Sequence, residues 1–343
     1  MSSTTTIVIL LLAPVLIFSI WHLTVSFVPS VPSPLQGKRI ILLIAHPDDE
    51  SMFFSPTLQA LTSPDLRNHV KILCMSTGNS DGIGETRRKE LEKAAVALGV
   101  RRREDVFVLD DARFKDGMKE KWDPLEIARV LASAFAPHLN VPPTSHATNE
   151  ESETKTKEKA NNSKSRSKSK HSRTPSKPQV ATPSHTPPAA PEGPRASIDV
   201  LITFDRYGIS DHPNHKALYD GATAFLKQIM HGHSGYACPV DLFVLSSVNM
   251  VRKYSFILDA IPTMLAGVYG SMLGNVQGTR GGTGRKDGRD RLLFVNDVSR
   301  YWKAREAMTQ GHQSQMVWFR WGWIGVGRYM VVNDLKRERI IAT

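Results

Sequence analysis

Two clusters of polar side chains, far apart in the chain, carry the residue types of a divalent metal site. The first cluster, AHPDDE at residues 45–50, directly follows the apolar run at residues 39–44. The second cluster, DHPNH at residues 211–215, follows another apolar run at residues 198–204. Open α/β sheets place their active sites outside the carboxyl ends of their strands. Both clusters are therefore predicted at one edge of a sheet, where they indicate metal-assisted hydrolysis.

The residues of the two clusters suggest separate roles. His46, Asp49 and His215 could supply three metal ligands and leave a fourth position for water. Asp48 lies beside a ligand and is a candidate base, and His212, when protonated, could stabilise an oxyanion or protonate a leaving amine. Each cluster alone is more typical of a helix cap, a surface or a core. The metal hypothesis requires the rings of His46 and His215 to lie within about a nanometre, because metal bonds are near 2 Å.

Alternating strand and helix patterns predict the fold class. The expected fold is α/β, Rossmann-like, with a mostly parallel sheet and helices on both faces, preceded by one N-terminal transmembrane helix. Strands are expected at residues 39–45, 70–75, 106–109, 198–204 and 242–248. Helices are expected at residues 52–61, 85–98, 124–135, 214–230 and 298–309.

The N-terminus predicts a membrane anchor. An uncharged tail at residues 1–6 precedes an apolar run at residues 7–28, which has roughly the 20 residues that a membrane span requires. A cleaved signal peptide is the alternative, but it needs a basic leading region that this tail lacks. Lys38 and Arg39 follow the run, so the positive-inside rule predicts that the rest of the chain faces the cytosol.

Composition divides the remaining chain. Residues 142–196 form a basic insert rich in Ser and Pro, which is expected to be disordered because it has few large apolar side chains. The insert interrupts a single catalytic domain predicted over residues 38–141 and 197–335. Its basic tract could bind nucleic acid, but a solvated insertion is the favoured interpretation, so no nucleic-acid partner is expected. Residues 267–290 predict a flexible Gly-rich loop, because they lack the Lys-Ser/Thr ending of a phosphate-binding loop.

The net charge indicates the kind of binding partner, and the cysteine content indicates the redox compartment. Lys and Arg total 44 against 33 Asp and Glu, a net charge of +11, which favours an anionic partner such as a membrane, a phospholipid or nucleic acid. The two cysteines, Cys74 and Cys238, exclude a disulfide framework and fit a reducing compartment. Aromatic and basic residues crowd together at residues 318–330. They fit a membrane interface or a helix packed on the core about equally well.

Four motifs together resemble the LmbE-like/PIG-L family of metal-dependent sugar de-N-acetylases. They are AHPDDE at residues 45–50, GIGETRRKEL at 82–91, TFD at 203–205 and HPNH at 212–215. The tail, with SQMVWFR at residues 314–320 and RYM at 328–330, is similar to the eukaryotic members of the endoplasmic reticulum. The resemblance covers about residues 38–140 and 197–335.

The resemblance implies a role for each matched residue. It implies a zinc ion, or another divalent metal, held by His46, Asp49 and His215. It implies that Asp48 is the general base and that His212 stabilises the transition state. Arg87 is implied to lie near bound substrate, and His312 to line the pocket. The chain departs from the family pattern at Asp211, where a small residue is expected.

The implied reaction is the second step of GPI-anchor synthesis. The acetyl group of N-acetylglucosaminyl-phosphatidylinositol would be removed to give acetate and glucosaminyl-phosphatidylinositol. The expected partners are this glycolipid and the membrane of the endoplasmic reticulum, which the chain would span once with its catalytic domain in the cytosol; the oligomeric state is left open. One alternative is a deacetylase of another N-acetylated sugar. The other is a catalytically silent, membrane-anchored scaffold whose basic insert binds RNA or acidic partners.

Overall fold

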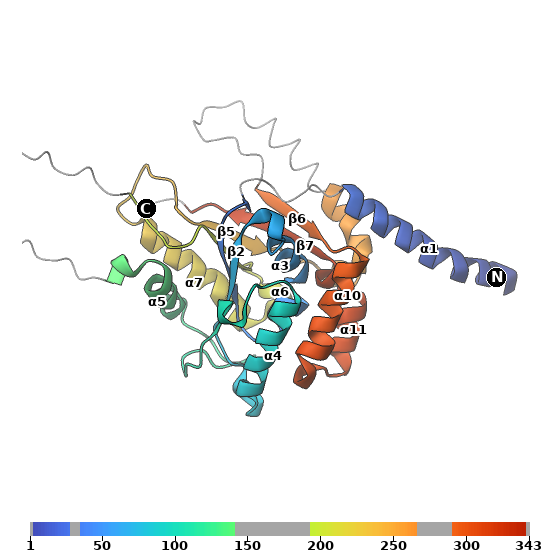
Figure 1. Cartoon of the computed structure of the whole chain (residues 1–343), viewed down its shortest axis with the longest axis horizontal. Helices are drawn as coiled ribbons and strands as arrows, with labels where there is room; N and C mark the ends of the chain where they lie inside the picture. The colour runs from blue at the N-terminus through green and yellow to red at the C-terminus, as the bar shows by residue number, and fades with distance from the viewer. Residues whose placement is uncertain (1–2, 28–34, 141–192, 266–289, 341–343) are drawn as a thin grey trace, which may run out of the picture. The chain divides into compact units, whose positions relative to one another are not determined.

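The structure is a computed structural model that describes residues 3–27, 35–140, 193–265 and 290–340, with side chains from residue 11 onward (Figure 1). The Gly-rich segment and the basic insert expected from the sequence lie outside the described residues, apart from a few residues at their ends.

The described strands form one sheet in the order β3-β2-β1-β4-β5-β7-β6. Strands β1 to β5 run parallel, and β7 runs antiparallel to both β5 and β6. The prediction of a mostly parallel sheet is therefore confirmed, although β6 and β7 were not predicted. The strands are β1 (Arg39–Ile44), β2 (His69–Cys74), β3 (Val106–Val108), β4 (Val200–Phe204), β5 (Asp241–Leu245), β6 (Arg291–Val295) and β7 (Val332–Glu338).

Helices cover both faces of this sheet, as the sequence predicts. Helices α5 and α7 pack on each other, and α7 packs on β1 and β4; α3, α4 and α10 lie on the other side (Figure 1). The predicted helix at residues 52–61 is two short helices, α2 and α3. The helices are α1 (Ser3–Phe27), α2 (Asp49–Met52), α3 (Ser55–Leu61), α4 (Gly84–Ala97), α5 (Pro124–Phe135), α6 (Gly208–Asp211), α7 (Pro213–Met230), α8 (Met250–Lys253), α10 (Val298–Glu306) and α11 (Trp318–Val326).

The strand order reverses between β1 and β4, and this reversal positions the two polar clusters. The chain runs from β1 outward to β2 and β3, then returns to β4 beside β1 and continues outward to β5. Ile40 of β1 pairs with Val200 of β4, and both are buried. Such a reversal leaves a crevice at the carboxyl ends of the two central strands, where open α/β sheets bind their ligands. The clusters that follow β1 and β4 thus meet.

The expected membrane span at residues 7–28 is not supported. None of the helices among the described residues has the length and apolar character needed to cross a bilayer. One side of helix α1 instead packs against the rest of the protein. Trp21 and Thr24 are buried, and the indole Nε1 of Trp21 donates a hydrogen bond to the carbonyl of Asn296 at 2.7 Å.

Strand β7, which lies between β5 and the edge strand β6, is bonded to α2 and α3 at the first polar cluster. The side chain of Asn333 is completely buried. Its Oδ1 accepts hydrogen bonds from the backbone N–H of Thr57 at 3.1 Å and from the Thr57 hydroxyl at 2.8 Å. Its Nδ2 donates to the carbonyl of Phe53 at 2.8 Å. These bonds fix the end of α2, which begins within the first polar cluster, and the start of α3.

We expect the substitution Asn333→Leu to lower the free energy of unfolding by about 2 to 6 kcal/mol, because it leaves two buried backbone groups without partners, at about 1 to 3 kcal/mol each. Urea denaturation followed by tryptophan fluorescence measures this loss. Lys336→Leu on the same strand is the control, because its side chain is half exposed. Equal stability of the two variants would contradict the role of Asn333.

Candidate active site

Asp49 joins the two polar clusters. Its Oδ2 accepts hydrogen bonds from the backbone N–H groups of Ala45 at 2.9 Å and His46 at 3.0 Å, both at the end of β1. Its Oδ1 lies 3.3 Å from Nε2 of His215. Burial acts to raise the pKa of Asp49, but His215, His46 and the backbone donor outweigh this and lower the pKa. The carboxylate is therefore ionised, fixed and directed at the second cluster.

His215 lies in the first turn of α7 and has one ring nitrogen available for a metal. Its Nδ1 is 2.9 Å from the carbonyl of Gly208; because a carbonyl only accepts, Nδ1 carries the hydrogen. Its Nε2 is buried and has no hydrogen-bond partner. In its neutral form, the ring therefore directs the Nε2 lone pair toward the Asp49 carboxylate, 3.3 Å away. Two acceptors held this close fit a shared metal ion, and the bond to Gly208 is the usual support for a ligating histidine.

His46 completes the candidate ligand set. The centroids of the His46 and His215 rings lie 5.6 Å apart, so the predicted convergence of the two clusters is confirmed. Potential ligand atoms of His46, Asp49 and His215 all lie within 4.8 Å of one another. Burial lowers the pKa of His46, which favours the neutral ring that a metal binds. The three side chains are buried, and together they fit a divalent metal with nitrogen and oxygen ligands.

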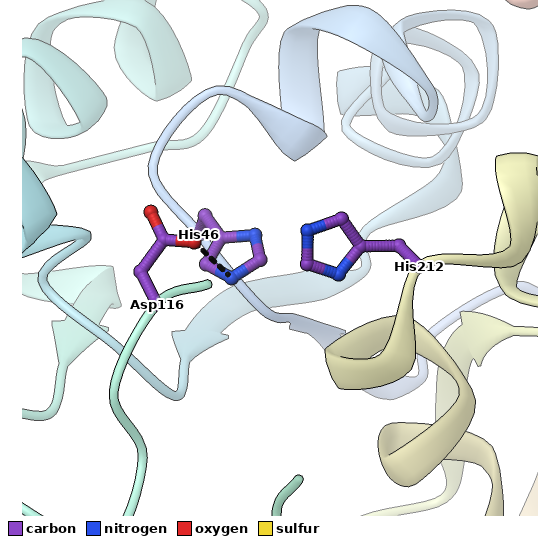
Figure 2. Close-up of side chains that lie close together, drawn as sticks. All are labelled: His46, Asp116 and His212. Atoms are coloured by element: carbon purple, nitrogen blue, oxygen red, sulfur yellow. Dashed lines mark ion pairs between the residues drawn. The ribbon is translucent and has the colours of Figure 1, made fainter. Parts of the chain in front are cut away.

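Asp116 is a further carboxylate at this site that the sequence did not reveal. Figure 2 shows Asp116 beside His46, with His212 facing the same histidine; the Oδ1 of Asp116 is 3.1 Å from Nε2 of His46. Potential ligand atoms of His46, Asp116 and His212 also lie within 4.8 Å of one another. Asp116 comes from the irregular segment between β3 and α5, where no motif marks it. His46 is therefore common to two adjacent sets of potential ligands.

Asp48 is held in an uncommon backbone conformation beside the candidate metal site. Its φ of 130° lies where non-glycine residues are rare, and such strain of about 1 to 3 kcal/mol is typical of functional sites. Two guanidinium groups face its buried carboxylate. Nη2 of Arg87 is 3.4 Å from Oδ2, and Nη1 of Arg320 is 2.5 Å from the same oxygen. Arg320 belongs to α11, and the sequence did not predict its contact with Asp48.

Arg87 connects the loops around the site. The residue is buried, and its guanidinium donates to the carbonyls of Gly78 at 2.8 Å and Pro47 at 2.9 Å. It also pairs with Asp116 at 3.1 Å. These bonds give Arg87 a positioning role next to Asp48. Direct contact between Arg87 and a substrate stays a prediction.

His212 lies over the ligand set in a neutral form. Its ring stacks on His215 with centroids 4.6 Å apart, and its Nδ1 accepts a hydrogen bond from the backbone N–H of Asn214 at 3.3 Å. Burial and the neighbouring histidines lower the pKa of His212 to about 4. The ring is therefore uncharged at neutral pH and carries its hydrogen on Nε2. The lowered pKa favours the neutral ring over the protonated form considered from the sequence, and the role of His212 stays a prediction.

His312 does not line an open pocket, contrary to the expectation. The residue is completely buried, and its Nε2 lies 2.6 Å from Oε1 of Glu50. Burial acts to lower the pKa of His312, but the Glu50 carboxylate outweighs it and raises the pKa. Glu50 in turn accepts a hydrogen bond from the backbone N–H of Asp48 at 3.2 Å. His312 thus supports the catalytic loop from behind.

Asp211, the departure from the family pattern, is directed away from the site. Its side chain is 84% exposed and pairs with Lys216 at 2.8 Å. The backbone φ is positive at Asp211 (63°) and at its two predecessors, Ile209 (38°) and Ser210 (73°). The loop therefore turns sharply, which delivers His212 and His215 to the site while the Asp211 carboxylate remains in solvent.

Comparison with known proteins agrees with this geometry. The family described as PIG-L: GlcNAc-PI de-N-acetylase matches residues 41–226, which include both clusters. The chain belongs to the PIG-L family. The N-acetylglucosaminyl-phosphatidylinositol de-N-acetylase of Arthroderma benhamiae is 40% identical over 99% of this chain and 100% of its own length. A probable enzyme of the same name from Schizosaccharomyces pombe is 33% identical over 88% of each chain.

Among solved structures, N,N'-diacetylchitobiose deacetylase from Pyrococcus horikoshii matches 88% of this chain and 84% of its own, with 14% identity and a TM-score of 0.44.

Replacement of either histidine of the ligand set should remove bound metal. We expect purified His46→Ala and His215→Ala to lose most of the divalent metal that the wild type carries, because a three-ligand site does not survive the loss of a ligand. Plasma mass spectrometry measures the metal per chain. His138→Ala is the control, because His138 is exposed and distant in sequence from both clusters. Equal metal content in all four proteins would contradict this ligand set.

Proposed function

We propose that this protein is a zinc-dependent hydrolase that removes the acetyl group from N-acetylglucosaminyl-phosphatidylinositol. Its products are acetate and glucosaminyl-phosphatidylinositol, and the reaction is the second step of GPI-anchor biosynthesis. The observation that carries the proposal is the buried set of His46, Asp49 and His215 beside the strained Asp48. Membership of the PIG-L family and similarity to a named de-N-acetylase over almost the whole chain support the choice of substrate.

His46, Asp49 and His215 would hold the zinc ion. When bound, the metal polarises the acetyl carbonyl and makes a water molecule more acidic. The residues around it fit amide hydrolysis. Asp48 accepts a proton from the attacking water, whose oxygen forms the new bond to the carbonyl carbon. As the carbon–nitrogen bond breaks, Asp48 returns the proton to the amine nitrogen. The free amine and acetic acid leave, and the acid loses its proton to solvent to give acetate.

His212 acts as a neutral hydrogen-bond donor in this scheme. Because its Nδ1 accepts the backbone N–H of Asn214, its Nε2–H is directed outward to the oxygen that becomes negative in the transition state. A nearby metal cation disfavours a second positive charge, so the lowered pKa of His212 is maintained when the site is filled. Arg87 and Arg320 keep the Asp48 carboxylate in place until it takes up the proton.

The proposed reaction takes place at the membrane of the endoplasmic reticulum, because the substrate is a membrane lipid and the relatives named above act on it. The net charge of +11 favours association with an anionic phospholipid surface. The cytosolic orientation of the catalytic residues stays a prediction, which depends on Lys38 and Arg39 after the apolar N-terminal run.

Asp48→Asn should abolish turnover and leave the fold intact. We expect acetate release from the glycolipid in vesicles to fall by roughly 10²- to 10⁴-fold, the usual contribution of a general base, while the metal content is unchanged. Asp211→Asn, one residue before His212 but facing solvent, is the matched control and should retain activity. Wild-type turnover in Asp48→Asn would rule out the base. Hydrolysis of soluble N-acetylglucosamine in preference to the glycolipid would instead indicate another sugar substrate.

Removal of residues 142–192 distinguishes the enzyme from the scaffold alternative. We expect the shortened chain to keep its deacetylase activity, because the segments on either side pair directly through β1 and β4 and the backbone N–H of Ser197 donates to the carbonyl of Phe135 at 2.8 Å. Acetate release by the full-length and shortened proteins is compared at equal concentration. Loss of activity in a folded, metal-loaded shortened protein would show that the insert takes part in function.

A further inference from the structure

Helix α11 exposes large aromatic side chains next to the active site. Trp318 is 85% exposed, Phe319 53% and Trp321 50%. Single exposed apolar residues are common on soluble proteins, but three neighbouring aromatic side chains form a patch that marks an interaction surface. A globular core would bury such side chains, so the arrangement favours a binding role for this surface.

A second exposed apolar group lies on and after α8. Val251 is 79% exposed, Met250 63% and Tyr254 45%, and Leu258 in the short 3-10 segment η6 (Phe256–Asp259) is 44% exposed. A third group lies on α1, where Leu12, Val15, Leu16 and Phe18 are each more than half exposed. Three separate elements therefore present large apolar side chains to the outside.

Aromatic contacts join these three groups. The rings of Tyr254, after α8, and Trp323, of α11, have centroids 5.9 Å apart. The rings of Phe256, in η6, and Trp21, of α1, have centroids 5.3 Å apart. The exposed residues of α1, α8, η6 and α11 thus belong to one connected assembly of elements. We call their exposed apolar side chains the apolar rim.

The same helix that exposes the aromatic residues also contacts the catalytic loop. Arg320 stands between Phe319 and Trp321 in the sequence, yet its guanidinium reaches Asp48 at 2.5 Å. The Nε1 of Trp323 donates to the carbonyl of Met52 at 3.0 Å. One face of α11 therefore supports the active site and the other belongs to the apolar rim. A partner bound to the rim would lie immediately beside the reacting groups.

An open depression connects α8 to the loop before His212. It has a volume of 380 Å³, and Ser210, Met250 and Lys253 are among its lining residues. The Nζ of Lys253 lies 2.9 Å from the hydroxyl of Ser210, and burial lowers the pKa of Lys253. One acidic side chain, Asp211, and one basic side chain, Lys253, both line the depression. The exposed apolar residues of α8 therefore lie beside a polar hollow that reaches the loop before His212.

We infer that the apolar rim docks the catalytic residues onto the surface of a phospholipid bilayer. Tryptophan and other aromatic residues with basic neighbours are typical of the membrane–water interface. Helix α10 adds an exposed aromatic residue next to a basic one, Trp302 and Lys303. The same helix packs on α1, because the ring centroids of Tyr301 and Trp21 are 5.6 Å apart. The consequence for catalysis rests on the proposed function: the sugar of a bilayer-embedded glycolipid would reach Asp48 without leaving the membrane surface.

Depth-dependent fluorescence quenching tests the docking independently of activity. Full-length protein with Cys238→Ser, in which Cys74 remains buried, would carry a single fluorophore on Trp318→Cys, Val251→Cys or Leu125→Cys. Leu125 of α5 is 58% exposed but does not belong to the rim, so it is the matched control. The proteins are bound to phosphatidylcholine–phosphatidylserine vesicles that contain a spin-labelled lipid.

We expect the fluorophores at positions 318 and 251 to lose most of their emission and the one at position 125 to keep it. Emission at positions 318 and 251 that matches position 125 would overturn the inference, and a protein partner would then be the occupant to seek.

A kinetic test links the docking to the substrate. We expect the double variant Trp318→Ser, Phe319→Ser to lose severalfold more kcat/KM on vesicle-borne glycolipid than on a water-soluble, short-chain analogue. The loss should appear as a raised KM with kcat unchanged. Leu125→Ser should show no such difference. An equal effect on both substrates would contradict the catalytic consequence of docking. Failure of the wild type to cleave either substrate would refute the proposed function, and the quenching experiment would still decide the docking.

Discussion

The geometry of the site depends on the carboxylate of Asp49. One oxygen accepts two backbone N–H groups at the end of β1, and the other faces the unpaired Nε2 of His215, which belongs to the neighbouring loop. A buried anion needs a partner of opposite charge. A cation shared by Asp49 and the neutral ring of His215 supplies that charge. The parallel pairing of β1 with β4 makes this meeting possible, because it brings two loops from distant parts of the sequence to one edge of the sheet.

The surrounding residues serve to hold a strained loop in place. Asp48 has a positive φ, which the structure maintains through several independent contacts. Glu50 accepts the backbone N–H of Asp48 and is itself paired with the buried His312. Arg87 and Arg320 approach the carboxylate of Asp48 from α4 and α11. The base is thereby tied to α11, which also carries exposed aromatic residues, so chemistry and membrane contact are connected through a single helix.

Local signals in the sequence were sufficient for the central sheet and for the candidate ligands. Runs of buried apolar residues mark β1 and β4, and the polar motifs directly after them place His46, Asp49 and His215. Strand β7 was missed because buried Asn333 and Asp334 and its charged end give no strand pattern; tertiary contacts decide its conformation. Asp116 and Arg320 reach the site through long-range packing that no local motif reveals. His312 is completely buried behind the loop that carries Asp48, and its place in the chain gave no sign of this burial.

Anomalous diffraction at the zinc edge, measured on crystals of the protein grown with zinc, tests the central claim most directly. The account predicts one strong peak at roughly 2.0 to 2.2 Å from a ring nitrogen of His46, an oxygen of Asp49 and Nε2 of His215, with Asp48 next to it and not bound. A peak elsewhere, or no peak between these three side chains, would contradict the account.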